Sequence, residues 1–176
     1  MKRDFDQVKF IKHNRVELPT KSTELAGAYD LTARGIIAWV TNDNIHLPKE
    51  ELEASEEAFR NGLPIKLNPF HRICIDTDLQ VADVPEDFKG DVKPRSGLAL
   101  KYGITVLNSP GLIDADFRDN IGIILMNTSN VPFEINFNDR IAQFEPRVGY
   151  EFEIVSTETI TEPKSSRNGG FGSTGR

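Results

Sequence analysis

The sequence of 176 residues has very little cysteine and no long apolar run. Its single cysteine, Cys74, cannot form a disulfide within the chain. No apolar stretch reaches the roughly 20 residues that a helix needs to cross a bilayer. The start, MKRDFDQVKF, lacks the apolar segment of a secretory signal. These absences predict a cytoplasmic protein that does not insert into a membrane.

Positive charge is also scarce. The chain has 21 Lys and Arg against 27 Asp and Glu, a formal net charge of -6. Because no run of Lys or Arg could hold a duplex or an anionic membrane, we expect no nucleic-acid partner. A small polyanion stays open, since a few Arg side chains, backbone N–H groups and a divalent cation can neutralise phosphates locally. Three widely spaced histidines, none beside Cys at ligand spacing, give no support to a zinc site.

Apolar side chains recur with a period of two, which is typical of β-strands. Residues 72–81 alternate between apolar and polar, and the same pattern is found at 131–137 and at 148–154. Residues 121–125 are more continuously apolar and predict a strand that is buried on both faces. Many short strands in a chain of one-domain length predict an all-β barrel or sandwich.

One segment departs from this pattern. Pro48 precedes and Gly62 follows the run KEELEASEEAFRN, and this punctuation predicts one short helix. The apolar residues of the run are Leu52, Ala54, Ala58 and Phe59. Because they are few, we expect the helix to lie on the surface, in an insertion around residues 44–66, outside the core.

The end of the chain has a Ser-, Gly- and Arg-rich composition that cannot fold alone. We therefore expect a β domain at 1–160 and a flexible arm at 161–176. Within the arm, RNGGFGSTGR combines glycines that let backbone N–H groups approach phosphates with hydroxyls, Arg167 and Phe171. Composition alone leaves two interpretations open, a disordered terminus and a nucleotide clamp.

Two central segments also combine chemical groups that suit a nucleotide. PRSGLALKYGI from Pro94 joins a cation, a hydroxyl and a glycine in one tight turn, and GLIDADFRDNIG from Gly111 follows closely. Turn residues at 108–111 lie between two apolar runs and predict a β-hairpin with an exposed tip. Uracil offers two carbonyl acceptors beside one N–H, so main-chain groups and the amide of Asn108 suffice to recognise it. Asn108 is then either the residue that reads the base or only a turn former.

Together these segments resemble the dUTPase family. AGAYDLTA, PRSG, GLIDADF, NDRIAQF at 138–144 and RNGGFGSTG match the five motifs of that family in order. The resemblance implies an all-β, jelly-roll-like subunit that forms a homotrimer. It also implies three active sites, each built from all three chains, with the C-terminal arm closing over the nucleotide. The implied activity is that of a dUTP diphosphatase, which hydrolyses dUTP to dUMP and pyrophosphate with Mg2+.

The resemblance implies a role for individual residues. Asp114 matches the general base, which takes a proton from the water that attacks the α-phosphorus. Asp30 matches the acid that helps to hold hydrated magnesium through water. Phe117 stands where the family usually has Tyr, and its ring is expected to pack on the deoxyribose and to leave no room for a 2′-hydroxyl. The expected substrate-binding residues are Arg95, Ser96, Gly97, Asn108, Gly111, Leu112, Ile113, Phe117, Gln143, Arg167, Phe171, Gly172 and Ser173.

Within that set, residues 95–97 and Gln143 are expected at the phosphates, Arg167 at the γ-phosphate and Phe171 on the uracil. Arg140 is assigned to structural pairing. The chain departs from the family pattern in two places: the fifth motif is one residue shorter between its Arg and its glycines, and roughly 20 extra residues separate the first two motifs. The sequence leaves three roles open for this insertion, which are neutral decoration, a trimer-edge contact and a docking surface for another protein.

Two other functions compete with the diphosphatase. A dCTP deaminase shares the trimeric fold and the end of the fourth motif, but that family resembles RSS with a following helical segment where this chain has PRSGLA. A dUTPase-fold regulatory protein would bind a protein partner through the insertion at 44–66. An intact Asp114 favours hydrolysis over pure binding, because a binding protein needs no general base.

Overall fold

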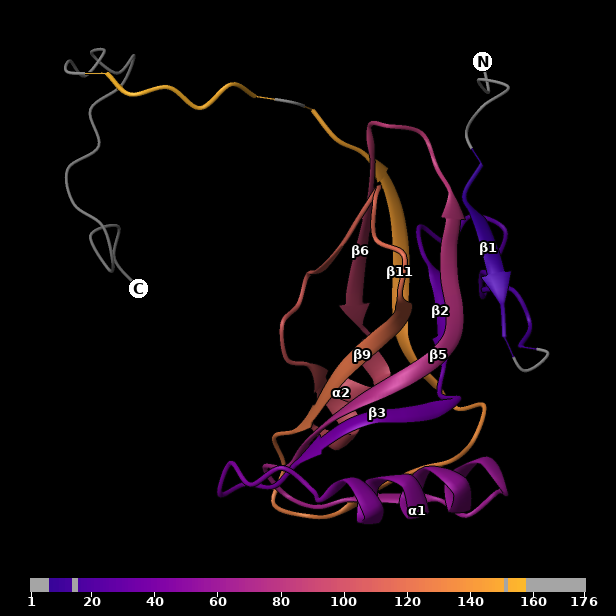
Figure 1. Ribbon diagram of the computed structural model, residues 1–176, viewed down its shortest axis with the longest axis vertical. Helices are drawn as coiled ribbons and strands as arrows, with labels where there is room; N and C mark the ends of the chain where they lie inside the picture. The colour runs from indigo at the N-terminus through magenta and orange to yellow at the C-terminus, as the bar shows by residue number, and fades with distance from the viewer. Residues whose placement is uncertain (1–6, 14–15, 151, 158–176) are drawn as a thin grey trace.

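The computed structural model describes residues 7–13, 16–150 and 152–157, and these form two larger β-sheets around one apolar core (Figure 1). A five-stranded sheet has the order β1-β5-β9-β7 with β3 also on β5, a four-stranded sheet has the order β2-β11-β6-β8, and β10 pairs with β4. The strands are β1 Lys9–Lys12, β2 Tyr29–Thr32, β3 Gly35–Val40, β4 Ile65–Leu67, β5 Arg72–Asp83, β6 Phe88–Pro94, β7 Ile104–Val106, β8 Gly111–Asp114, β9 Asn120–Asn127, β10 Phe133–Ile135 and β11 Arg140–Val148. The helices are α1 Lys49–Arg60 and α2 Ser96–Tyr102. The all-β prediction is confirmed.

The period-two patterns at 72–81 and 121–125 form the centre of the larger sheet. β5 pairs antiparallel with β9, with Ile73 opposite Leu125 and Ile75 opposite Ile123, and all four side chains are buried. The other face of β9 is only half-buried, so the expectation that this strand is buried on both faces is wrong. β9 instead alternates between buried and half-buried residues, as a strand at one face of a core does.

Helix α1 forms where Pro48 and Gly62 predicted it, but its relation to the core differs from the expectation. Phe59 is 1% exposed and meets the Phe137 ring edge-on at a centroid distance of 5.6 Å. Leu52 packs against the same core from the previous turns of the helix. The helix lies along the lower end of the sheets, next to β3 (Figure 1). The prediction that the insertion lies outside the core is therefore wrong for the buried stripe of α1.

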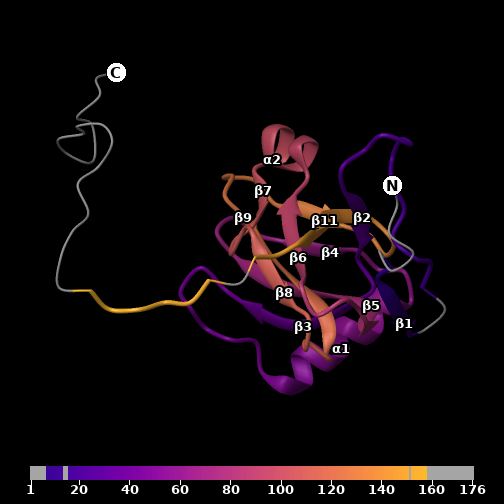
Figure 2. The same cartoon turned by 90° about the horizontal axis from the view of Figure 1, so that it is seen from above.

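A second helix, α2, follows directly after Arg95, where the sequence interpretation placed only a tight turn. Its residues Leu98, Ala99, Leu100 and Lys101 all favour helix, and it ends at Gly103, whose φ is +67°. Figure 2 shows α2 and α1 on opposite sides of the sheets. At the level of the sequence, the lack of a helix after PRSG separates this chain from dCTP deaminases. Because a helix does follow PRSG, that distinction no longer holds, and the comparison with the deaminases depends on the other motifs.

The hairpin predicted around residues 108–111 is wrong in its pairing. β7 pairs with β9 in the five-stranded sheet, whereas β8 pairs with β6 in the four-stranded sheet. The turn at 108–111, which contains a cis peptide bond before Pro110, therefore joins the two sheets. Both flanking apolar runs form strands as expected, but each strand pairs with a different neighbour from the one predicted.

The two remaining alternations are shorter than predicted. Only β10 forms within 131–137, and β11 ends at Val148. Tyr150, Phe152 and Ile154 are 80%, 82% and 97% exposed, so a strand at 148–154 is not present in the described chain. This segment leads away from the sheets (Figure 1), and the expected arm at 161–176 lies outside the described residues. Among the described helices, neither is long and apolar enough to cross a bilayer.

Replacing Phe59 by Ala should lower the free energy of unfolding by about 3–5 kcal/mol, because it removes a fully buried ring and leaves a cavity. Leu63→Ala is the matched control, since Leu63 lies in the same insertion but is exposed, and it should change stability by less than about 0.5 kcal/mol. Urea unfolding of both variants measures the difference. Equal effects would contradict the docking of α1 on the core.

Candidate active site

Two arginines hold one buried carboxylate at the end of the four-stranded sheet. Asp30 accepts a hydrogen bond from Nε of Arg95 on Oδ1 and one from Nη1 of Arg140 on Oδ2, both at 3.1 Å. Arg95 also donates from Nη1 to the backbone carbonyl of Arg140 at 3.2 Å. The assignment of Arg140 to structural pairing agrees with this contact. Three of the five N–H donors of Arg95 stay available, so the same side chain can still face a phosphate.

Strand pairing brings these residues together from three parts of the chain. β11 lies between β2 and β6, with Gln143 opposite Asp30 on one side and opposite Lys93 on the other. Ser96 and Gly97 follow at the end of β6, and both are exposed. The expected phosphate residues 95–97 and Gln143 therefore lie beside Asp30 in one group, which we call the phosphate-end cluster. This cluster consists of Asp30, Arg95, Ser96, Gly97, Arg140 and Gln143.

The expected uracil-binding residues form a second group around β8. Gly111 and Ile113 face the core, whereas Leu112 and Asp114 face outward. Ile113 can therefore contact a ligand only through its backbone. The amide nitrogen of Asn108 lies 3.2 Å from the position that a Cβ on Gly111 would take, so a larger residue there would displace this amide slightly. The Asn108 side chain thus lies beside the turn whose backbone was expected to read the base.

The loop after β8 sets the relation between Asp114 and Phe117. The N–H of Phe117 donates to the carbonyl of Asp114 at 3.1 Å, and Phe117 packs against the core while half-buried. Nη1 of Arg118 donates to the carbonyls of Ala115 at 2.8 Å and of Phe117 at 2.9 Å. The sequence interpretation gave Arg118 no role. The only signal was a cation directly after GLIDADF, which is too common to single out.

The Asp114 carboxylate accepts no side-chain hydrogen bond from the part of the chain that the structure describes, and the residue is exposed. This freedom suits a group that must accept a proton from water. Cys74, the other side chain with nucleophilic chemistry, is unsuited, because burial raises the pKa of its thiol to about 11. At neutral pH the thiol is therefore protonated, and the carboxylate is the better base.

Within one chain the two groups are well separated. Asp114 lies opposite Lys89 on one side of β6, and Gln143 lies opposite Lys93 on the other side. Lys89 and Lys93 are four residues apart along β6, and Asp114 and Gln143 each lie one strand spacing from β6 on opposite sides. The two distances combined place the Cα atoms of Asp114 and Gln143 roughly 16 Å apart. Between them lies the nearly buried Asp91, which pairs with Arg147 at 2.5 Å. One chain thus presents the two halves of the expected site in different places.

The donor set fits magnesium only if the nucleotide brings the ion. Among the described residues no group of three or more His, Cys, Asp or Glu could hold a metal. Each carboxylate oxygen of Asp30 accepts one hydrogen bond from an arginine. Because a carboxylate has about four acceptor positions, its remaining positions can still accept hydrogen bonds from water. The residues present therefore fit a hydrated cation whose main ligands are phosphate oxygens.

Four expected site residues, Arg167, Phe171, Gly172 and Ser173, lie outside the described residues, so their contacts stay predictions. The other expected residues, including Asp30 and Asp114, are all described, and they fall into the two groups above.

The two-sheet all-β fold is similar to that of solved phage dUTPases. The dUTPase of Staphylococcus bacteriophage 80alpha, a variant solved with dUpNHpp, matches with a TM-score of 0.72 at 18% identity, covering 97% of this chain and 99% of that one. A variant of the dUTPase from phage phi11 of S. aureus, described as coordinating a structural Mg(II) ion, matches with a TM-score of 0.65 at 17% identity over 89% of this chain and 99% of that one. At such identity the likeness shows the fold.

The chain belongs to the dUTPase family, whose family model matches residues 63–175. The deoxyuridine 5'-triphosphate nucleotidohydrolase of Fusobacterium nucleatum is 36% identical over 170 residues, covering 97% of both chains. The enzyme of the same name from Wolbachia sp. subsp. Brugia malayi is 46% identical over 118 residues, which cover 65% of this chain and 74% of that one. The resemblance read from the five motifs, and the expectation of an enzyme, are confirmed.

The two arginines on Asp30 should contribute unequally to stability. The Arg95 side chain is 25% exposed and the Arg140 side chain 55% exposed, so solvent screens the second pair more. Double-mutant cycles with Asp30→Asn, Arg95→Gln and Arg140→Gln should give a coupling of about 1–2 kcal/mol for Asp30–Arg95 and less than about 1 kcal/mol for Asp30–Arg140. Urea unfolding measures all single and double variants. A larger coupling for Arg140 would contradict the described geometry.

Proposed function

We propose that this chain is a dUTP diphosphatase, which hydrolyses dUTP to dUMP and pyrophosphate with Asp114 as general base. The observation that carries the proposal is the exposed Asp114 carboxylate, uncommitted within the described chain, on a loop whose geometry is tied to Phe117. The names of the curated relatives support the substrate. They favour this reaction over deamination of dCTP.

In the proposed reaction, Asp114 accepts a proton from a water molecule that attacks the α-phosphorus. A bond forms between the water oxygen and the α-phosphorus, and the bond from that phosphorus to the bridging oxygen of the β-phosphate breaks. Pyrophosphate leaves with the electron pair, and dUMP keeps the new oxygen. A carboxylate suits this role because it is ionised at neutral pH and can hold the water within hydrogen-bond reach.

The phosphate-end cluster would bind the triphosphate. The remaining N–H donors of Arg95, the hydroxyl of Ser96, the backbone at Gly97 and the amide of Gln143 offer donors to phosphate oxygens. Asp30 would contact a hydrated Mg2+ through water, and the ion, when bound, offsets the phosphate charge and gathers the oxygens. The two arginines on Asp30 fix the direction of its carboxylate.

The second group would bind the nucleoside. The amide of Asn108 and the backbone of residues 111–113 offer donors and acceptors for the uracil edge. The exposed Leu112 side chain lies on the same outward face as Asp114. Phe117 would pack on the deoxyribose and exclude a 2′-hydroxyl, and Phe171, Gly172, Ser173 and Arg167 of the arm would cover the base and the γ-phosphate.

We also propose that the active site is shared between the chains of a homotrimer. The separation of roughly 16 Å between Asp114 and Gln143 supports this, because a neighbouring copy can bring a second phosphate-end cluster to Asp114. The exposed apolar side chains of Tyr150, Phe152 and Ile154 support it as well. An alternating apolar segment that has no partner within the described residues is an expected interface element.

The direct test offers dUTP, UTP, dTTP and dCTP with magnesium to the full chain and follows pyrophosphate and ammonia. Pyrophosphate from dUTP, with little from the other three nucleotides, is the expected result. Ammonia from dCTP would instead support the deaminase. Neither product from any nucleotide would reject the enzymatic proposal and favour the dUTPase-fold regulatory protein.

Asp114→Asn should lower kcat for dUTP about a hundred- to ten-thousandfold, because the amide cannot accept the proton. Binding of a non-hydrolysable imido analogue should change little, since size and shape are kept. Asp116→Asn is the matched control, because Asp116 is an exposed acid in the same loop with no proposed role. Pyrophosphate release measures both variants. Comparable losses in the two variants would remove Asp114 from the role of base.

A further inference from the structure

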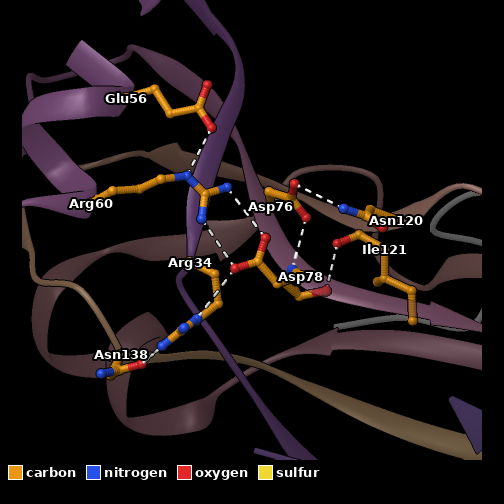
Figure 3. Close-up of polar contacts among 9 residues, drawn as sticks. Arg34, Glu56, Arg60, Asp76, Asp78, Asn120, Ile121 and Asn138 are labelled. Carbon is orange, nitrogen blue, oxygen red and sulfur yellow. Dashed lines mark hydrogen bonds and ion pairs between the residues drawn. The ribbon is translucent and has the colours of Figure 1, made fainter. Parts of the chain in front are cut away.

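The insertion helix ends in a forked ion pair with a carboxylate of the central strand (Figure 3). Nη1 and Nη2 of Arg60 donate to Oδ2 and Oδ1 of Asp78 at 3.1 and 3.2 Å, and Nε donates to Glu56 on the same helix at 3.0 Å. Asp78 is 1% exposed, so its charge needs compensation inside the protein. A Cβ on Gly35 would meet the Arg60 guanidinium at 2.4 Å, so glycine there leaves the space that this contact occupies.

Asp78 also contacts an arginine that follows the first motif. Nε of Arg34 lies 3.5 Å from Oδ2 of Asp78, and Nη1 of Arg34 donates to the side-chain oxygen of Asn138, the first residue of the fourth motif (Figure 3). The Arg34 guanidinium lies over the Phe137 ring, 4.3 Å from its centroid. Arg34 is thus positioned by Asp78 on one side and holds the start of the fourth motif on the other.

The backbone of Asp78 is linked through Asp76 to Asn120, three residues after the third motif. Oδ1 of Asp76 accepts the backbone N–H of Asp78 at 2.8 Å, and Oδ2 of Asp76 accepts the side chain of Asn120 at 3.1 Å. Asp78 has a φ of +55°, and the pairing of β5 with β9 is irregular between Asp76 and Gln80. This strained point of β5 therefore depends on its polar contacts for its geometry.

The Arg34–Asn138 contact lies at the base of the phosphate-end cluster. The backbones of Ala33 and the turn 138–139 exchange two hydrogen bonds, from Ala33 to Asp139 and from Asn138 to Ala33, both at 2.9 Å. β2, which carries Asp30, ends at this junction, and β11, which carries Arg140, begins there. Arg34 thus contacts the junction from which the strands of Asp30 and Arg140 extend.

We infer that Arg60 is a positioning residue for the phosphate-end cluster, and that α1 acts on the active site through Asp78, Arg34 and Asn138. The inference rests on the proposed function. When the forked partner of Asp78 is removed, Arg34 is the described arginine that remains beside this buried charge, and it moves toward Asp78 and away from Asn138. The insertion then has a role within its own subunit, beyond decoration or the docking of another protein.

The test separates the triphosphate from the nucleoside. Arg60→Met keeps the apolar stem and removes the charge, and it should weaken binding of the imido analogue of dUTP about tenfold. The KM for dUTP should rise by a similar factor, with a smaller change in kcat. Binding of dUMP, which lacks the β- and γ-phosphates, should change less than about twofold. Arg60→Lys, which keeps the charge without the fork, should lie between Arg60→Met and the unchanged chain.

Lys49→Met is the control, because Lys49 is an exposed cation of the same helix that pairs only with the exposed Glu53 four residues on in the described chain. It should leave the binding of both ligands, KM and kcat unchanged. If Arg60→Met fails to fold, Arg60→Lys carries the test, because it keeps a cation beside Asp78 and should show a smaller loss with the same selectivity for the analogue over dUMP. Calorimetric titration and steady-state kinetics measure every variant.

Two results would overturn the inference. One is unchanged binding of the analogue by the Arg60 variants, and the other is an equal loss for dUMP and for the analogue, which indicates general damage. The proposed function fails separately, because its failure is seen in the unchanged chain as an absence of pyrophosphate from dUTP. Activity in the unchanged chain with unaltered Arg60 variants rejects only the role of Arg60.

Discussion

Neutralisation of the buried Asp78 carboxylate is the constraint on which the rest of this subunit depends. An isolated charge in such a place costs several kcal/mol, and removal of one partner of a buried pair is strongly destabilising. Among the described residues, two arginines from distant parts of the sequence pair with Asp78, Arg34 from the corner between β2 and β3 and Arg60 from the end of α1. Hydrogen bonding to Asp78 raises the pKa of Arg60 above its ordinary value, so this arginine stays charged at neutral pH. Docking of the helix and closure of the β2–β3 corner are therefore linked, since each brings an arginine to the same buried carboxylate.

The same arrangement recurs at Asp30, where Arg95 and Arg140 each take one carboxylate oxygen. The difference between the two carboxylates is exposure of their partners, because Arg140 is open to solvent while Arg34 is enclosed. Asp78, whose partner Arg34 is enclosed, stabilises the fold. Asp30, whose partner Arg140 is open to solvent, leaves N–H donors available for an anion. The phosphate-end cluster is thus a polar junction of the sheet that remains open on one side.

The sequence predicted the elements better than it predicted their partners. The alternation at 72–81 and the Pro48 and Gly62 punctuation identified β5 and α1, because both are local patterns. Phe59 was misplaced since a short helix with few apolar residues gives no sign of which one will be enclosed. Asp78 looks like an outward polar residue of a strand, and only the irregular register makes it buried.

The alternation at 148–154 looks like a strand because it is suited to a partner surface, yet its own chain provides none in the described structure. For the proposed active site, the motifs predict the residues, and the division of the described ones into two separate groups follows from sheet pairing, which could not be read from the sequence.

The central claim is that one active site uses Asp114 of one chain and the phosphate-end cluster of another. The most direct measurement co-expresses Asp114→Asn with Arg95→Gln under two different tags, purifies the mixed oligomers and follows pyrophosphate release from dUTP. Each variant alone should be nearly inactive. Random mixing of two chains that share sites should restore about a quarter of the sites, because one neighbour must supply an intact base and the other an intact arginine. Activity no greater than the sum of the two variants would contradict the account, since it would mean that both groups act within a single chain.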